Sequence, residues 1–153
     1  MGGTMWPSLK KFTFLSLFLL LFLLLVPACQ SEEAAPTPTS RAQVVIDITS
    51  GVPSPQWELS AAEVEELAQL LGALPPENPI ALYDGLGYRG FVITMTSPQR
   101  VIRVQNGHVA VEQGGANQTF ADTDQLLEKW LLSISKPHVE PQLYSTLEEA
   151  IEK

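Results

Sequence analysis

An Asn-Gly pair at 106–107, flanked by alternating apolar residues, is the feature that most constrains how this chain folds. Both central residues of a two-residue hairpin turn need positive φ angles, which Asn and Gly tolerate best. The pair therefore predicts antiparallel strands at 100–105 and 108–112. A further strand at 90–96 precedes them, and Ser-Pro-Gln at 97–99 turns the chain between. Together these segments predict an antiparallel meander.

Helical patterns lie on both sides of this meander. A capping box of Ser60 and Glu63 opens a helix that ends near Gly72. A second helix begins at Asp122 or Thr123 and ends at Lys136-Pro137, where proline cannot continue it.

A strand at 43–49 precedes the first helix, residues 113–119 have the composition of a polar loop, and a capping box at 145–148 predicts a short C-terminal helix. The expected fold class is α+β. It has a small antiparallel sheet of about four strands, with two main helices packed on one face and a short C-terminal helix.

The N-terminal residues 1–28 have the plan of a secretory signal peptide. Lys10-Lys11 is followed by an apolar run over 12–26 and then by Cys29, the single cysteine of the 153-residue chain. One cysteine permits no disulfide within the chain. The alternative is an uncleaved anchor helix, but this stretch is at the short end for spanning a bilayer, and Pro27 would break the helix near its exit.

The residues Val-Pro-Ala-Cys at 26–29 resemble the lipobox of bacterial lipoproteins, in which an apolar residue stands three positions before the cysteine. The resemblance implies cleavage before Cys29, a thioether from its sulfur to diacylglycerol, and acylation of its freed amine by a chain such as palmitate. Each buried methylene contributes about 0.8 kcal/mol, so two or three chains hold the protein firmly at a membrane. Gln30 replaces the Asp that resembles an inner-membrane retention signal, which favours the outer membrane in a Gram-negative cell.

The sequence after the leader divides into two parts. Residues 29–42 comprise the lipidated cysteine and a flexible acidic tether rich in Pro and Thr, without large apolar side chains. Residues 43–153 form a single α+β domain. The formal net charge is −8, and loss of Lys10 and Lys11 makes the remainder more acidic, so we expect no nucleic-acid partner.

Three patterns suggest a cofactor or metal site, but the sequence around each does not fit such a site. The Gly-Leu-Gly-Tyr-Arg-Gly run at 85–90 matches the dinucleotide-binding pattern but leads into a strand, whereas that pattern must open a helix. His108 and Glu112 share a strand face but stand about 13 Å apart, and His138 with Glu140 offers too few ligands. No cofactor and no metal site are expected, and no set of catalytic residues is visible.

Trp57, Tyr88 and Arg89 are the candidate ligand or partner site. Each belongs to a stretch that contains a predicted loop rich in Gly or Pro, and aromatic and Arg side chains are enriched at binding hot spots. Their segments resemble those of a family of small secreted domains with the patterns S-G-x-P-x-P-x-W-x-L and G-Y-R-G-F. Arg and Asn often stand in that family where this chain has Val52 and Ser54, and the resemblance implies no activity. The alternative is that Trp57 and Tyr88 are packing residues and that Arg89 pairs with a surface acid.

The sequence thus predicts a membrane-anchored lipoprotein of the bacterial cell envelope that faces the extracytoplasmic side. Its membrane contact is the lipid on Cys29, and its domain is a non-enzymatic binding or interaction module for an envelope protein or a small ligand. The alternative is a small envelope hydrolase or accessory factor whose site is assembled from distant residues.

Overall fold

A computed structural model of the chain describes residues 40–49, 51 and 53–152. The predicted leader at 1–28, Cys29 and most of the predicted tether lie outside these residues. Within them, no helix combines the length and the apolar character needed to cross a membrane.

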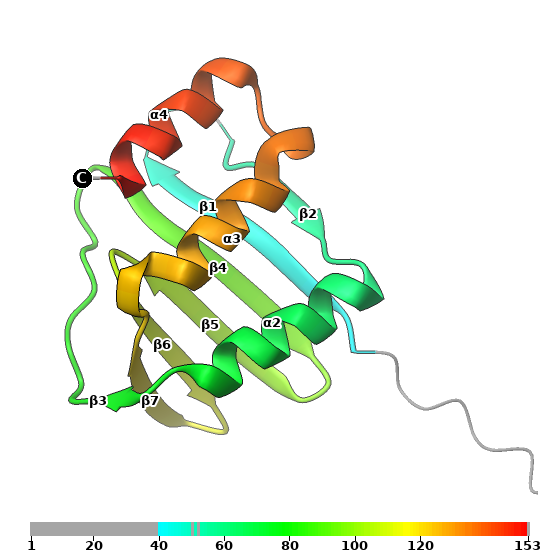
Figure 1. The fold of residues 1–153 in the computed structure, drawn as a ribbon, viewed down its shortest axis with the longest axis vertical. Coiled ribbons are helices and arrows are strands. Elements are labelled where there is room, and N and C mark those ends of the chain that lie inside the picture. Colours follow the sequence, from blue (N-terminus) through cyan, green and yellow to red (C-terminus); the bar gives the residue numbers. More distant parts are fainter. Residues whose placement is uncertain (1–39, 50, 52, 153) are drawn as a thin grey trace, which may run out of the picture. The chain divides into compact units, whose positions relative to one another are not determined.

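The strands of the described residues form one antiparallel sheet, ordered β2-β1-β4-β5-β6-β7-β3 (Figure 1). Their bounds are β1 (Ala42–Thr49), β2 (Gln56–Glu58), β3 (Pro76–Glu77), β4 (Gly87–Thr96), β5 (Gln99–Gln105), β6 (His108–Gln113) and β7 (Ala116–Ala121). The prediction of about four strands is wrong, because the sheet has seven. β2 and β3 are short edge strands, and β7 occupies most of the stretch that was predicted to be a polar loop.

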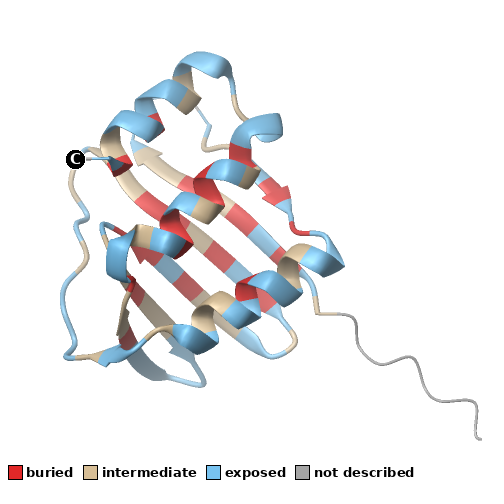
Figure 2. Ribbon diagram, in the orientation of Figure 1, coloured by how far each residue is buried: buried red, intermediate tan, exposed pale blue. Residues whose placement is uncertain are grey.

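Three helices, α2 (Ala61–Ala73), α3 (Leu126–Ser135) and α4 (Pro141–Ile151), lie on the same face of the sheet (Figure 1). Short 3-10 turns precede and follow α3, at Thr123–Gln125 and Lys136–His138. The core lies between these helices and the strands, where the buried residues gather (Figure 2). Leu67, Leu131 and Leu147, one from each helix, are fully buried there. The predicted α+β class, with helices on one face of an antiparallel sheet, is confirmed.

Of the two capping boxes predicted from the sequence, the first marks the start of a helix and the second does not. The capping box is present: the Glu63 amide donates to Ser60 Oγ at 3.3 Å, and the Ser60 amide donates to Glu63 Oε2 at 2.7 Å. The predicted start of the last helix at 145–148 is wrong, because α4 begins at Pro141. Proline suits the first turn of a helix, where its missing N–H costs no hydrogen bond. The Ser145 hydroxyl donates to the Pro141 carbonyl at 3.2 Å, so it lies inside the helix.

The predicted hairpin turn at 106–107 is confirmed. Asn106 and Gly107 have φ angles of 50° and 78°, and Gln105 pairs with His108 across the turn. Both central residues therefore take the left-handed conformation that this turn requires.

A β-bulge interrupts the pairing of β1 with β4. Ile46 pairs with Phe91 and Ile48 with Tyr88, so Arg89 and Gly90 together lie opposite the single residue Asp47. A bulge leaves one residue unpaired and increases the local twist of the strands. Gly90 takes a φ of 94° here, in the region that favours glycine.

Candidate functional site

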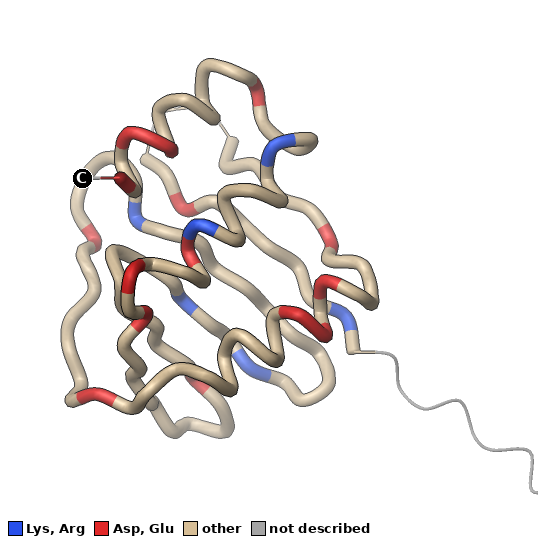
Figure 3. The backbone as a smooth tube through the Cα atoms, in the orientation of Figure 1, with Lys and Arg blue, Asp and Glu red and all other residues tan. Residues whose placement is uncertain are grey.

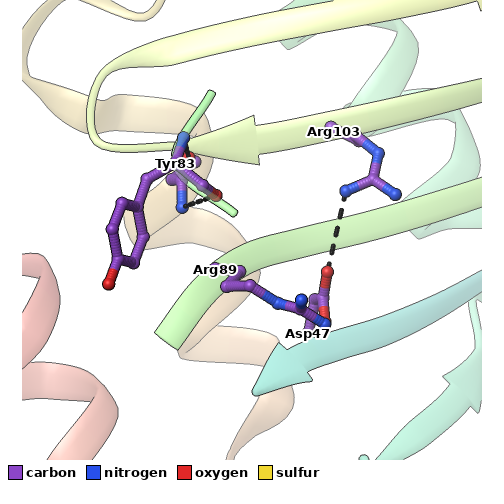
Figure 4. A network of polar contacts seen from close by, with 5 residues as sticks. Asp47, Tyr83, Arg89 and Arg103 are labelled. Carbon is purple, nitrogen blue, oxygen red and sulfur yellow. Dashed lines mark hydrogen bonds and ion pairs between the residues drawn. The ribbon is translucent and has the colours of Figure 1, made fainter. Parts of the chain in front are cut away.

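The sheet face away from the helices, which we term the open face, carries a polar network at the β-bulge (Figure 4). Arg89 donates from Nε to Asp47 Oδ1 at 3.1 Å, and its Nη2 contacts the same oxygen at 2.5 Å. Arg103 of β5 approaches Asp47 Oδ2 with Nη1 at 3.6 Å. One carboxylate therefore orients two guanidinium groups from two strands.

A segment at 78–86, which we term the cover loop, connects β3 to β4 and is held at the end of β5. Gln105 Oε1 accepts from the Tyr83 amide at 2.8 Å, and Gln105 Nε2 donates to the Tyr83 carbonyl at 3.1 Å. Figure 4 shows the Tyr83 backbone close to the end of this strand. Because Gln105 is 2% exposed, the two bonds are shielded from water and hold the loop in one position.

The cover loop presents large apolar side chains to solvent. The exposed fractions are 41% for Ile80, 55% for Tyr83 and 82% for Leu86. The Tyr83 hydroxyl donates to the Leu86 carbonyl at 3.1 Å, which fixes the tip of the loop. Exposed apolar residues gathered on one ordered loop are a feature of interaction surfaces.

A hollow of about 400 Å³ lies between the cover loop and the open face of β5, β6 and β7. Ile80 and Leu82 line it from the loop, and Val101, Arg103, Glu112 and Thr119 line it from the strands. The hollow thus combines an apolar wall with one cation and one anion.

The central strands carry three arginines, of which Arg89 and Arg103 lie on the open face and Arg100 faces the helix side. Arg89 lies on β4, Arg100 and Arg103 lie on β5, and α2 carries acids without a basic residue (Figure 3). Arg89 and Arg103 both contact Asp47, so the negative charge of this carboxylate is already compensated within the domain.

A second polar cluster lies on the helix side, centred on the buried carboxylates of Glu128 and Asp122. The Tyr88 hydroxyl donates to Glu128 Oε1 at 2.7 Å, and the Gly107 amide donates to Glu128 Oε2 at 3.4 Å. Asp122 accepts from the Leu127 and Glu128 amides at 3.0 Å each. Its carboxylate therefore satisfies two amides of the first turn of α3, although the helix begins at Leu126, after a 3-10 turn, and not at Asp122 or Thr123 as predicted. These bonds tie the 106–107 turn to the start of α3.

Burial shifts the protonation equilibria of this cluster. Desolvation raises the pKa of Glu128 above its ordinary value, although the bond from Tyr88 acts in the opposite direction. Desolvation, followed by the charge of Glu128, also raises the pKa of Tyr88. The cluster is a structural connection between two elements, in which Glu128 is fully buried and Tyr88 is half-buried.

Replacement of Glu128 by Gln is expected to change how stability depends on pH. With a raised pKa in the folded state, Glu128 favours folding below its ordinary pKa, and this contribution is lost as pH rises through the raised value. Gln is neutral throughout, so the free energy of unfolding of Glu128→Gln, relative to the original chain, should increase between those two pKa values. The slope cannot exceed about 1.4 kcal/mol per pH unit for one proton. Urea unfolding at a series of pH values measures it, with exposed Glu112→Gln as the control, and parallel curves would refute the assignment.

The structure does not bring the predicted residues Trp57, Tyr88 and Arg89 to one rim. Trp57 lies on β2, is 6% exposed, and stacks on the His138 ring at 5.1 Å between centroids. Tyr88 faces the helices, whereas Arg89 lies on the open face with Asp47. The sheet therefore separates Arg89 from the two aromatic residues, and the packing alternative describes all three.

One part of that expectation is correct. β1 and β4 are antiparallel, and Thr49 pairs with Gly87, so the loops after β1 and before β4 emerge at the same end of the sheet. The two candidate segments are neighbours, but alternation along β4 sends adjacent side chains to opposite faces.

The two histidines each contact one partner. His108 Nδ1 lies 2.9 Å from Glu77 Oε1 across the sheet, and His138 stacks on Trp57. Within the ranges that the structure describes, no three His, Cys, Asp or Glu side chains are grouped so that they could hold a metal ion.

Sequence reasoning missed Gln105, Arg103 and the cover loop. The one available signal was the apolar content of residues 80–86, because loop residues between prolines and glycines seldom include Ile, Leu and Tyr together. The chain matches no protein-family model, no curated protein and no solved structure.

Proposed function

We propose that this chain is a lipoprotein of the bacterial cell envelope and that its domain binds a partner without catalysing a reaction. In this proposal a lipid on Cys29 anchors it to the extracytoplasmic side of a membrane, the outer one where the cell has two. The basic, apolar and small-residue order of 1–28 supports the anchor. The anchor segment lies outside the described residues, so the proposal rests there on sequence.

One observation carries the binding role, namely the pair of hydrogen bonds from buried Gln105 to the Tyr83 backbone. They keep the cover loop ordered while its side chains at Ile80, Tyr83 and Leu86 stay exposed. An ordered loop loses little conformational entropy on binding, and its exposed apolar side chains gain burial when a partner covers them. The cover loop and the adjacent open face are the proposed interaction surface.

Lipidation is tested by the intact mass of the protein extracted from membranes. We expect a mature chain that begins at Cys29 and carries diacylglycerol with a further acyl chain. The variant Cys29→Ser should accumulate as an unprocessed precursor, because the acceptor sulfur is absent. A mature protein that retains residues 1–28, or that begins elsewhere without lipid, would rule out the anchor.

The interaction surface is tested by a photoreactive amino acid placed at Leu86 in the membrane-bound protein of intact cells. We expect one discrete adduct, because Leu86 is the most exposed of the loop's large apolar side chains. The same probe at exposed Gln69 of α2, on the other side of the sheet, is the matched control and should give none.

The variant Gln105→Ala adds a second arm to this test. It removes both bonds that hold the cover loop, so it should weaken the Leu86 adduct while the far-ultraviolet circular dichroism persists. If the probes at Leu86 and Gln69 gave equal amounts of adduct, the interaction surface would lie elsewhere. The same would follow if Gln105→Ala left the amount of Leu86 adduct unchanged.

A further inference from the structure

The hollow between the cover loop and the open face has three oxygen acceptors on its strand side. Glu112 of β6 lies directly opposite Asn117 of β7. Two residues further along, Ala110 lies opposite Thr119. Strand alternation places these four side chains on one face, and all of them line the hollow. Because directly opposite Cβ atoms are about 4.5–5.5 Å apart, the small Ala110 side chain leaves space for a ligand atom between the carboxylate, the amide and the hydroxyl group.

The uncompensated charge at this hollow is negative. Glu112 is exposed, and it takes part in none of the ion pairs between the residues that the structure describes. Arg103 also lines the hollow, but its guanidinium reaches across β4 to Asp47 of β1 (Figure 4). The hollow therefore favours a ligand with a positive charge and disfavours an anion.

The rest of the lining suits an alkyl chain that ends in this charge. Ile80 and Leu82 of the cover loop and Val101 of β5 form an apolar wall. Thr119 is only 8% exposed, so its hydroxyl group lies at the base of the hollow. A Ca²⁺ ion takes about 6–8 oxygen ligands, more than this site offers, and would gain nothing from an apolar wall. An organic cation with an aliphatic stem matches the lining.

We propose that this hollow binds the ammonium group of a lysine side chain of the partner protein. An ammonium group has three N–H donors and no acceptor, which matches the oxygen acceptors of Glu112, Asn117 and Thr119. The four-carbon stem of the lysine packs on Ile80 and Leu82. A guanidinium group spreads five donors over a planar fork, so it would leave several of them without partners here. This inference rests on the proposed function, because it names the chemistry by which the partner is recognised at the proposed interaction surface.

The first test is a nuclear magnetic resonance titration of the isotope-labelled full chain, in detergent micelles, with N-acetyl-lysine methylamide. We expect saturable shifts at the amides of Ala110, Glu112 and Thr119, with about millimolar affinity for so small a probe. The norleucine analogue keeps the four-carbon stem and lacks the ammonium group. Its affinity should be at least about tenfold weaker, because it loses the charge-assisted contact. The arginine analogue should also bind more weakly than the lysine probe.

Variants assign the contacts. Glu112→Gln should abolish the preference for the lysine probe over the norleucine analogue, and Thr119→Val should lower the affinity for the lysine probe about threefold or more. Glu58→Gln is the matched control: Glu58 is an exposed acid on the open face, but it lies on β2, at the opposite edge of the sheet from β7 and β3. This variant should bind like the original chain.

The second test is carbodiimide coupling in the native membrane, because this reagent joins a carboxylate to an amine in contact with it and does not couple a guanidinium group. We expect an amide bond between Glu112 and a lysine of the protein that the Leu86 photoprobe captures, located by mass spectrometry of the linked peptides. Glu58 should form no such bond with that protein.

The outcomes separate this inference from the proposed function. Absence of binding by the lysine probe, equal affinity for its norleucine analogue, or tighter binding of the arginine analogue overturns the lysine assignment. A Leu86 photo-adduct together with any of these results leaves the interaction surface standing without this site. Lysine-probe binding without the Glu112 coupling product shows a site for a small amine and overturns the partner lysine, whereas binding without a Leu86 adduct places the partner surface elsewhere.

Discussion

Replacement of Gly90 by Ala is expected to cost about 4 kcal/mol of stability or more, a loss large enough to leave much of the chain unfolded. The φ of Gly90 is 94°, where a non-glycine residue is strained by about 1–3 kcal/mol. In addition, a Cβ atom would lie 2.1 Å from the Val104 carbonyl oxygen and 2.9 Å from Gln105 Cβ. Val104 belongs to the central strand β5 and is fully buried, so its backbone cannot move aside without disrupting the sheet.

Urea unfolding followed by circular dichroism measures this loss. Gly72→Ala is the matched control, because a Cβ atom there meets nothing within 4 Å and the residue lies inside α2. The control should raise stability by about 0.5–1 kcal/mol, since alanine is the better helix former. If Gly90→Ala unfolded at the same urea concentration as the original chain, the close approach of β4 to β5 would be refuted.

Replacement of Asp122 by Ala is expected to cost about 3 kcal/mol. The Asp122 carboxylate accepts from the amides of Leu127 and Glu128, and the side chains of all three residues are buried. Alanine removes both acceptors, so it leaves two donors without partners at the start of α3. Loss of a helix cap alone costs about 0.5–2 kcal/mol, and burial of the donors increases the penalty.

Asp122→Asn is the control for this effect, because it keeps one carbonyl oxygen and the shape of the side chain. Its loss should be about half that of the alanine variant in the same unfolding experiment. An alanine variant with unchanged stability would mean that water replaces the carboxylate and that the cap contributes little.

The parts of the fold that were predicted correctly depend on residues close together in the chain. The Asn106-Gly107 turn and the Ser60–Glu63 capping box each use the chemistry of two to four consecutive residues. β7 was missed because Phe120 is its single large apolar residue, and its pairing with β6 depends on the partner strand. β2 was also missed. Trp57 is its single large apolar residue and follows a proline-rich stretch that indicates a loop.

The candidate site was harder to predict because its contacts join distant residues. Gln105 and Tyr83 are 22 positions apart, and Arg89 and Asp47 are 42 positions apart. The sequence does not show whether a glutamine in a strand is exposed to water or makes hydrogen bonds to the backbone of a loop. The choice of Tyr88 and Arg89 as one site overlooked strand alternation, which places them on opposite faces of the sheet.

The two edges of the sheet have a consequence for copies of the domain at high local concentration. β2 has three residues and β3 has two, and Glu58, Pro76 and Glu77 place charges or a missing N–H on these outer strands. A second copy would need a longer row of unpaired backbone groups to extend the sheet, and charged or proline-bearing edges discourage that extension. The domain can therefore be crowded at high density without aggregating strand to strand.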